Sequence, residues 1–151
     1  AGATTIFHVK IPGEKMQMKS DHYVPLTDRM IEIIKTMEPL TGQGRYVFCT
    51  QTRGRDYPIS ENTLTKGIRI VLKIENISGD MVSHGARSMF STLAYENFQE
   101  HKVIPEVIER QLDHRERNKV KDAYNHAEYL NERRVLMQWW SDYLDRLKNN
   151  H

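Results

Sequence analysis

Apolar residues recur at helical spacing through most of this chain and alternate with polar residues only near its start. Apolar and polar side chains alternate between Ile6 and Pro12, and after a turn at Gly13 the segment 22–26 has the pattern of a second short strand. From Thr27 onward, apolar positions instead fall three and four residues apart, as on one face of a helix. This change of period predicts an α+β fold, a helix-rich domain with a small antiparallel β-sheet near the N-terminus.

The predicted helices begin at Thr27, Ser60, Ser83, Pro105 and Leu130. Three of these starts offer a hydroxyl that can cap the first turn, and proline fits the first helical position. We expect the first helix to end near Pro39, the last to run to about Lys148, and a buried strand over 46–49. The positions expected to face inward on the last three helices are Phe90, Leu93, Ala94 and Phe98, then Val107, Ile108 and Leu112, and then Leu136, Trp140, Tyr143 and Leu147.

The composition excludes several kinds of protein. The single cysteine, Cys49, can form neither an internal disulfide nor a cysteine zinc cluster. With 151 residues, of which 38% are hydrophobic and 28% charged, the chain fits one globular domain, and its net charge of +2 does not by itself indicate nucleic acid. No stretch approaches the roughly 20 apolar residues of a membrane span, and no secretory signal is recognisable. We therefore expect a cytoplasmic protein without membrane contact.

His84 and Arg87 stand three residues apart in a segment that is expected to be helical, which places them on one face. Such a pair could hold a phosphate. The guanidinium is a permanently charged two-pronged donor, and the imidazole can donate a hydrogen bond or move a proton near neutral pH. Taken alone, the pair is more simply explained as two polar residues on a capped helix.

His114 and Tyr124 follow in the same part of the chain. His114 closes the segment 111–114 at the end of a short helix, where the helix dipole favours a protonated imidazole. Tyr124 comes ten residues later, after the charged run 115–122. Taken singly, the histidine is more commonly a surface cap and the tyrosine a packing residue.

In combination these residues resemble the tyrosine recombinase family, whose catalytic domains carry a His-x-x-Arg box, a Leu-Gly-His-like box and then a nucleophilic tyrosine. His84 to Arg87, Leu112 to His114, and Tyr124 occur in that order. The likeness to the integrases of phages and genomic islands extends over nearly the whole chain. The segments that carry it are 44–48, 58–64, 105–112, 116–120, 123–125 and 128–140.

The resemblance implies a role for each matched residue. Tyr124 would attack the scissile phosphate to give a 3′-phosphotyrosyl protein and a free 5′-hydroxyl, a link that conserves bond energy and needs neither metal nor cofactor. Arg87 and His114 would stabilise charge on the non-bridging oxygens, and His84 would assist proton movement at the tyrosine hydroxyl. Tyr129 is the rival nucleophile, but its block looks like the family segment after the active tyrosine, so Tyr124 is favoured.

Two features of the family pattern are missing. Family members carry a further catalytic arginine before the hairpin, and this chain begins too late to contain it. We therefore interpret 1–151 as one partial catalytic domain without core-binding and arm-binding domains, and expect it to be inactive or nearly so. The family's general-acid lysine is expected where this chain has Gln17. Lys15 and Lys19 flank it and are the candidates to replace it, unless both are simply solvated hairpin lysines.

The resemblance also implies double-stranded DNA at attachment sites and other integrase protomers as partners. Arg53 and Arg55 in a polar loop, with Lys66 and Arg69 on the next helix, are candidates for phosphate contacts, although a charged helix face is usually only solvated. The pair 139–140 consists of tryptophans, which we expect in the core, with exchange of the C-terminal helix between protomers as the alternative.

The leading hypothesis is thus an enzyme that integrates or excises mobile DNA by strand cleavage and rejoining. The alternative from another class is a catalytically inactive DNA-binding or interaction module of the same fold, which Gln17 favours. A topoisomerase-like nicking and closing activity would share the chemistry without synapsis of two sites. A metal-dependent nuclease is least favoured, because the sequence has neither clustered carboxylates nor histidines at ligand spacing.

Overall fold

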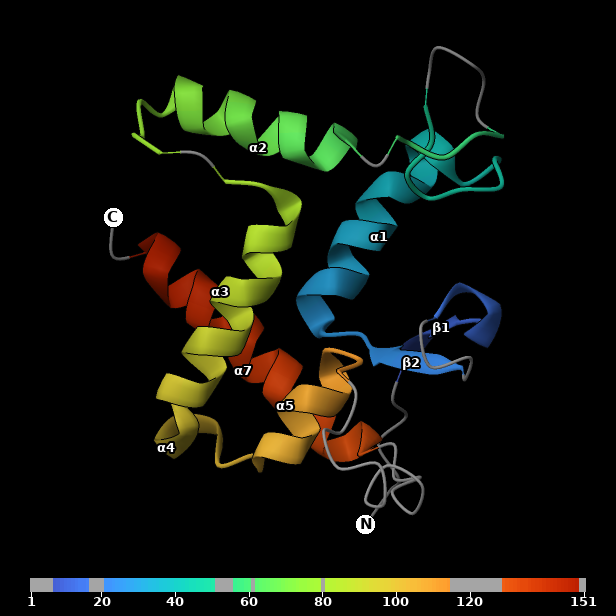
Figure 1. The fold of residues 1–151 in the computed structure, drawn as a ribbon. Coiled ribbons are helices and arrows are strands. Elements are labelled where there is room, and N and C mark those ends of the chain that lie inside the picture. The colour runs from blue at the N-terminus through green and yellow to red at the C-terminus, as the bar shows by residue number, and fades with distance from the viewer. Residues whose placement is uncertain are drawn as a thin grey trace. The chain divides into compact units, whose positions relative to one another are not determined.

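The computed structural model describes residues 7–16, 21–50, 56–60, 62–79, 81–114 and 129–149, drawn in colour in Figure 1. These residues divide between two compact units. The terminal unit lies within residues 1–29 and 91–151, and the middle unit within 30–90. Helices α1 (Asp28–Thr41) and α3 (Ser83–Glu96) each have residues in both units.

An antiparallel hairpin of β1 (His8–Ile11) and β2 (His22–Pro25) begins the terminal unit, as the alternation of the sequence predicted (Figure 1). The single turn η1 (Gly13–Lys15) follows β1. Asp21 stabilises this end of the hairpin, because its carboxylate accepts a hydrogen bond from the Gly13 amide at 3.0 Å and lies 2.6 Å from the Lys10 ammonium. The Lys10 and Gly13 hydrogen bonds together lower the pKa of Asp21 below its usual value.

The core of the terminal unit lies where α5 (Pro105–Gln111) packs beside α7 (Leu130–Asn149), orange and red in Figure 1. The fourth helix, α4 (Phe98–His101), and strand β2 also contact α7. Apolar spacing on α5 and α7 turns one face of each toward the other. The buried apolar residues are Ala94, Val103, Val107, Ile108, Leu112, Leu136, Met137 and Trp139.

His101 is a core residue of α4. Its Nε2 lies 2.7 Å from the carbonyl oxygen of Ala94, its Nδ1 accepts from the Val103 amide at 3.0 Å, and its ring meets the edge of Trp139 at 4.9 Å. A neutral imidazole with the proton on Nε2 satisfies both hydrogen bonds, because the carbonyl can only accept and the amide can only donate. Both ring nitrogens of this histidine are therefore used in holding the fold.

In the middle unit, α2 (Asn62–Ile74) follows a short turn in which the Thr63 amide donates to the Ser60 carbonyl at 2.9 Å. None of its residues is buried, and Leu64 and Ile74 are 60% and 72% exposed. Its link to α3 is polar. Thr65 Oγ1 accepts from the Ser83 amide at 3.3 Å and lies 3.2 Å from Ser83 Oγ.

The predicted buried strand over 46–49 is wrong. Val47 and Phe48 are 43% and 50% exposed, and the pairing is a single antiparallel bridge between Cys49 and Pro58. Two backbone hydrogen bonds flank this bridge, from the Thr50 and Ile59 amides. No further backbone hydrogen bond joins the described residues 46–50 and 56–59, so the pairing is too short to be a strand.

Two helix boundaries and the burial of one helical residue differ from expectation. Helix α1 continues through Pro39 to Thr41, whose hydroxyl bonds the Met37 carbonyl at 3.1 Å. Phe98 begins α4 instead of extending α3 and is 39% exposed, because Asn97 turns the chain and its side chain bonds the Leu93 carbonyl. Leu147, at the end of α7, is 44% exposed, since periodicity shows which face is apolar but not how far the packing partners reach along it.

The lowered pKa of Asp21 predicts how the hairpin responds to acid. Since the folded hairpin favours the charged carboxylate, its stabilisation is complete above the ordinary pKa of 3.8 and is lost as the pH falls below that through the lowered value. An NMR titration should give a midpoint for Asp21 below 3.8, with the Gly13 amide shifting alongside. Lys10→Met should raise the midpoint and Lys35→Met should not. A wild-type midpoint at or above 3.8 would contradict this account.

Candidate active site

The first two turns of α3 carry His84 and Arg87, as the sequence predicted. The start of the helix is attached to α2 through Thr65 and Ser83, as described above. Residues three apart on a helix project from one face, and both side chains are exposed. The pair thus lies on one exposed face of α3 in the middle unit.

The backbone before His114 forms a Schellman motif at the end of α5. The His114 amide donates to the Glu109 carbonyl at 3.0 Å, and the Asp113 amide donates to the Arg110 carbonyl at 3.2 Å. This motif needs a residue in the left-handed conformation just after the helix cap, and Asp113 occupies that position with a φ of 51°. Glycine is the usual residue there, and aspartate is among the few others that tolerate the conformation. Local geometry therefore accounts for a Leu-Gly-His-like box that here reads Leu-Asp-His.

Glu109 orients the His114 ring. Its Oε2 lies 2.8 Å from His114 Nδ1, and its Oε1 accepts from the Tyr95 hydroxyl at 2.6 Å. A carboxylate only accepts, so Nδ1 carries the proton and Nε2 points away from this contact. Sequence reasoning missed both partners. A signal was present, because the Schellman motif brings the residue five before the histidine back beside it.

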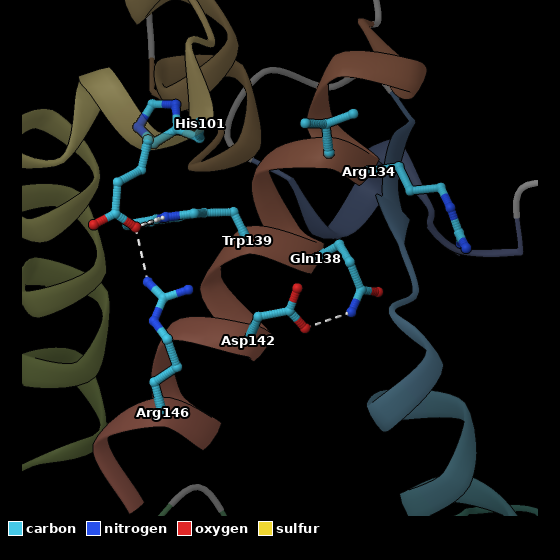
Figure 2. Close-up of a pocket in the computed structure, with 8 residues that line it drawn as sticks. His101, Arg134, Gln138, Trp139, Asp142 and Arg146 are labelled. Carbon is cyan, nitrogen blue, oxygen red and sulfur yellow. Dashed lines mark hydrogen bonds and ion pairs between the residues drawn. The ribbon is translucent and has the colours of Figure 1, made fainter. Parts of the chain in front are cut away.

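A pocket of about 430 Å³ lies along α7 in the terminal unit (Figure 2). Several of its polar groups bond one another. Glu100 accepts from Trp139 Nε1 at 2.8 Å and from Arg146 at 2.7 Å, and these bonds lower its pKa, while Gln138 donates to Asp142 at 2.9 Å. Of the predicted catalytic residues that the structure describes, namely His84, Arg87 and His114, none lines it. This pocket is therefore not the predicted active site.

Within the ranges that the structure describes, no three His, Cys, Asp or Glu side chains gather as metal ligands would. Nor does any helix in those ranges have the length and apolar character needed to cross a membrane.

Comparison with known proteins decides the family. Residues 4–131 match the Phage integrase family. The chain belongs to the phage integrase family. Its matched region contains the His84 to Arg87 box, the His114 box and Tyr124 in family order, and its helix-rich fold with a small hairpin is that of a tyrosine recombinase catalytic domain.

Its similarity to individual integrases covers most of this chain and part of theirs. Prophage integrase IntA of Escherichia coli K12 is 38% identical over 133 residues, which are 88% of this chain and 30% of the relative. The integrase of Shigella phage Sf6 is 35% identical over 91% of this chain and 34% of its own length, and that of Enterobacteria phage P4 is 34% identical over 90% and 30%. The chain thus spans about a third of the length of these relatives. No solved structure gave a significant match.

The structure locates part of the predicted integrase site. It brings His84 and Arg87 together in the middle unit and places Lys15 and His114 in the terminal unit, where Lys15 is exposed on η1. Lys66 and Arg69 are exposed on α2. The predicted residues that fall outside the described ranges are Gln17, Lys19, Arg53, Arg55 and Tyr124. Their roles stay predictions.

The contact between Glu109 and His114 predicts a specific tautomer. Glu109→Ala should release the ring and redistribute the proton between its nitrogens, at a stability loss of about 0.2–1 kcal/mol, because the pair is partly exposed. Nitrogen-15 NMR of His114 should report a proton on Nδ1 in the wild type and a mixture in the variant. Glu96→Ala, an exposed change on α3, is the control. An unchanged spectrum in Glu109→Ala would show that the carboxylate does not hold the ring.

Proposed function

We propose that this chain is the catalytic part of an enzyme of site-specific DNA recombination, which integrates or excises mobile DNA. The observation that carries the proposal is the family match over residues 4–131, which contains all four candidate catalytic residues. The names of the relatives, prophage and phage integrases, support the same class of activity.

The proposed reaction proceeds through a protein–DNA ester. The Tyr124 hydroxyl loses its proton with help from His84 and attacks the phosphorus, and the bond from phosphorus to the 5′ oxygen breaks. The products are a 3′-phosphotyrosyl protein and a 5′-hydroxyl. Attack by a 5′-hydroxyl on the ester reverses the step and rejoins the strands, without metal or ATP.

Arg87 and His114 stabilise the charge that develops on the non-bridging oxygens. Because Glu109 binds Nδ1 of His114, the nitrogen that faces the phosphate is Nε2. Nε2 donates a hydrogen bond to the phosphate when the imidazole is protonated. The Glu109 carboxylate then lies beside a positive ring, which is a favourable contact. Each well-placed donor of this kind contributes roughly a hundred- to thousand-fold in rate.

The partners in this proposal are double-stranded DNA and other protomers of the same protein bound to it. Lys66 and Arg69, exposed on α2, supply phosphate contacts together with Arg53 and Arg55. An enzyme acting on mobile DNA of this kind works in the cytoplasm.

The deciding experiment incubates the full-length protein with a nicked suicide DNA substrate. We expect a covalent adduct that peptide mass spectrometry maps to Tyr124. Tyr124→Phe should abolish it, since the ester oxygen is gone, and the matched change Tyr129→Phe should leave it. Tight DNA binding with no adduct at any tyrosine would instead establish the second candidate, a non-catalytic DNA-binding module, which Gln17 favours.

The same substrate tests which lysine replaces the family's general acid. If Lys15 or Lys19 protonates the leaving 5′ oxygen, its change to Ala should slow cleavage about 10²- to 10⁴-fold. Replacing that oxygen by sulfur should restore the rate, because a thiolate leaves without a proton. Lys35→Ala, a surface lysine elsewhere, is the control. Equal rates for both lysine variants and wild type would show that neither acts as the acid.

A further inference from the structure

Arg133 on α7 is the largest of the fully buried side chains that the structure describes, and 0% of it is exposed. Its Nε donates to Gln111 Oε1 at 2.8 Å, at the end of α5. Its Nη2 donates to the carbonyl oxygen of Tyr23 on β2 and lies 3.3 Å from Nε2 of His22. One buried guanidinium therefore joins three separate elements.

His22 extends this contact toward the His114 box. The guanidinium keeps its protons, so the His22 nitrogen facing it must accept, and the ring proton lies on Nδ1. That nitrogen is 3.9 Å from Oδ1 of Asp113, an electrostatic contact slightly too long for a hydrogen bond. Asp113 is the left-handed residue immediately before His114.

The Arg133 contacts lie at both ends of the segment that carries Tyr124. The described chain stops at His114 and resumes at Tyr129, and Arg133 reaches the first end through Gln111 and through His22 and Asp113. At the second end, the Arg133 amide donates to the Tyr129 carbonyl at 2.8 Å and begins α7. Its bond to the Tyr23 carbonyl attaches both ends to the hairpin.

We propose that Arg133 is a positioning residue, which fixes the two ends of the Tyr124 segment to each other and to β2. The inference rests on the proposed function and adds a residue to it. Arg133 is buried and does not touch the DNA; it acts through the placement of Tyr124 and His114. A buried charge is costly to keep, and an apolar side chain of similar volume would fill this space as well. The guanidinium adds bonds in several directions at once, which an apolar side chain cannot supply.

The test compares Arg133→Met with Arg134→Met in the full-length protein. Arg134 is the adjacent arginine of α7, and it contacts the Leu26 carbonyl at 3.0 Å and Asp28 at 3.3 Å instead. We expect Arg133→Met to bind DNA within about twofold of wild type but to form the tyrosine adduct about 10- to 100-fold more slowly, because a misplacement near 1 Å costs about that much. Arg134→Met should keep both values.

Several outcomes would overturn the proposal. If wild type forms the adduct and folded Arg133→Met forms it equally fast, the positioning role is wrong and the proposed function stands. Equal losses of DNA affinity and rate in both arginine variants would indicate a general loss of positive charge on α7 instead. If wild type forms no adduct at all, the proposed function fails, and the positioning role fails with it.

If Arg133→Met does not fold, a second pair of variants at Gln111 tests the same positioning role. Gln111→Glu keeps an oxygen facing Arg133 Nε, and Gln111→Met removes it. We expect the glutamate variant to retain the adduct rate within about threefold and the methionine variant to lose about tenfold. Equal rates in the two would overturn the proposal.

Discussion

A buried guanidinium must find hydrogen-bond acceptors, and in the terminal unit this requirement determines how α7 meets its neighbours. Arg133 finds its acceptors on β2 and at the end of α5, 110 and 22 residues away in sequence. Its desolvation costs several kcal/mol, and the apolar contacts around it must offset that cost. Val107, Ile108 and Leu136 are at most 1% exposed, and each contributes about 1.5–3 kcal/mol by full burial. Apolar burial thus supplies the stability, and the Arg133 hydrogen bonds fix where α7 meets β2 and the end of α5.

The Schellman motif at the end of α5 fixes the position of His114 relative to that helix. A helix that ended without it would leave the Glu109 and Arg110 carbonyls without backbone partners. Because the chain turns back there, the Glu109 side chain reaches His114 Nδ1, and Tyr95 holds its other oxygen. The orientation of this exposed ring is therefore set by a backbone motif and one carboxylate. The same turn brings Asp113 to the buried His22.

The sequence predicted the hairpin, the helices and the spacing of His84 and Arg87, because these depend on local periodicity and capping. It failed where a partner distant in the chain decides the outcome. A strand was expected over 46–49, but among the described residues its pairing with 57–59 is limited to one bridge, between Cys49 and Pro58. Arg133 could not be found either, since an arginine on an amphipathic helix is ordinarily solvated and its contact with His22 spans 111 residues. The role of Tyr124 stays a prediction.

The histidines of the terminal unit show why residue type alone does not identify a catalytic group. His101 uses both ring nitrogens on backbone atoms in the core, and His22 faces Arg133 with one nitrogen and Asp113 with the other. His114 is exposed and has one nitrogen held by Glu109. Of these three arrangements, the last is the one that leaves a nitrogen directed outward on an oriented ring, which is what a phosphate donor requires. The number and direction of a histidine's hydrogen-bond partners, more than the sequence motif around it, distinguish a structural histidine from a candidate catalytic one.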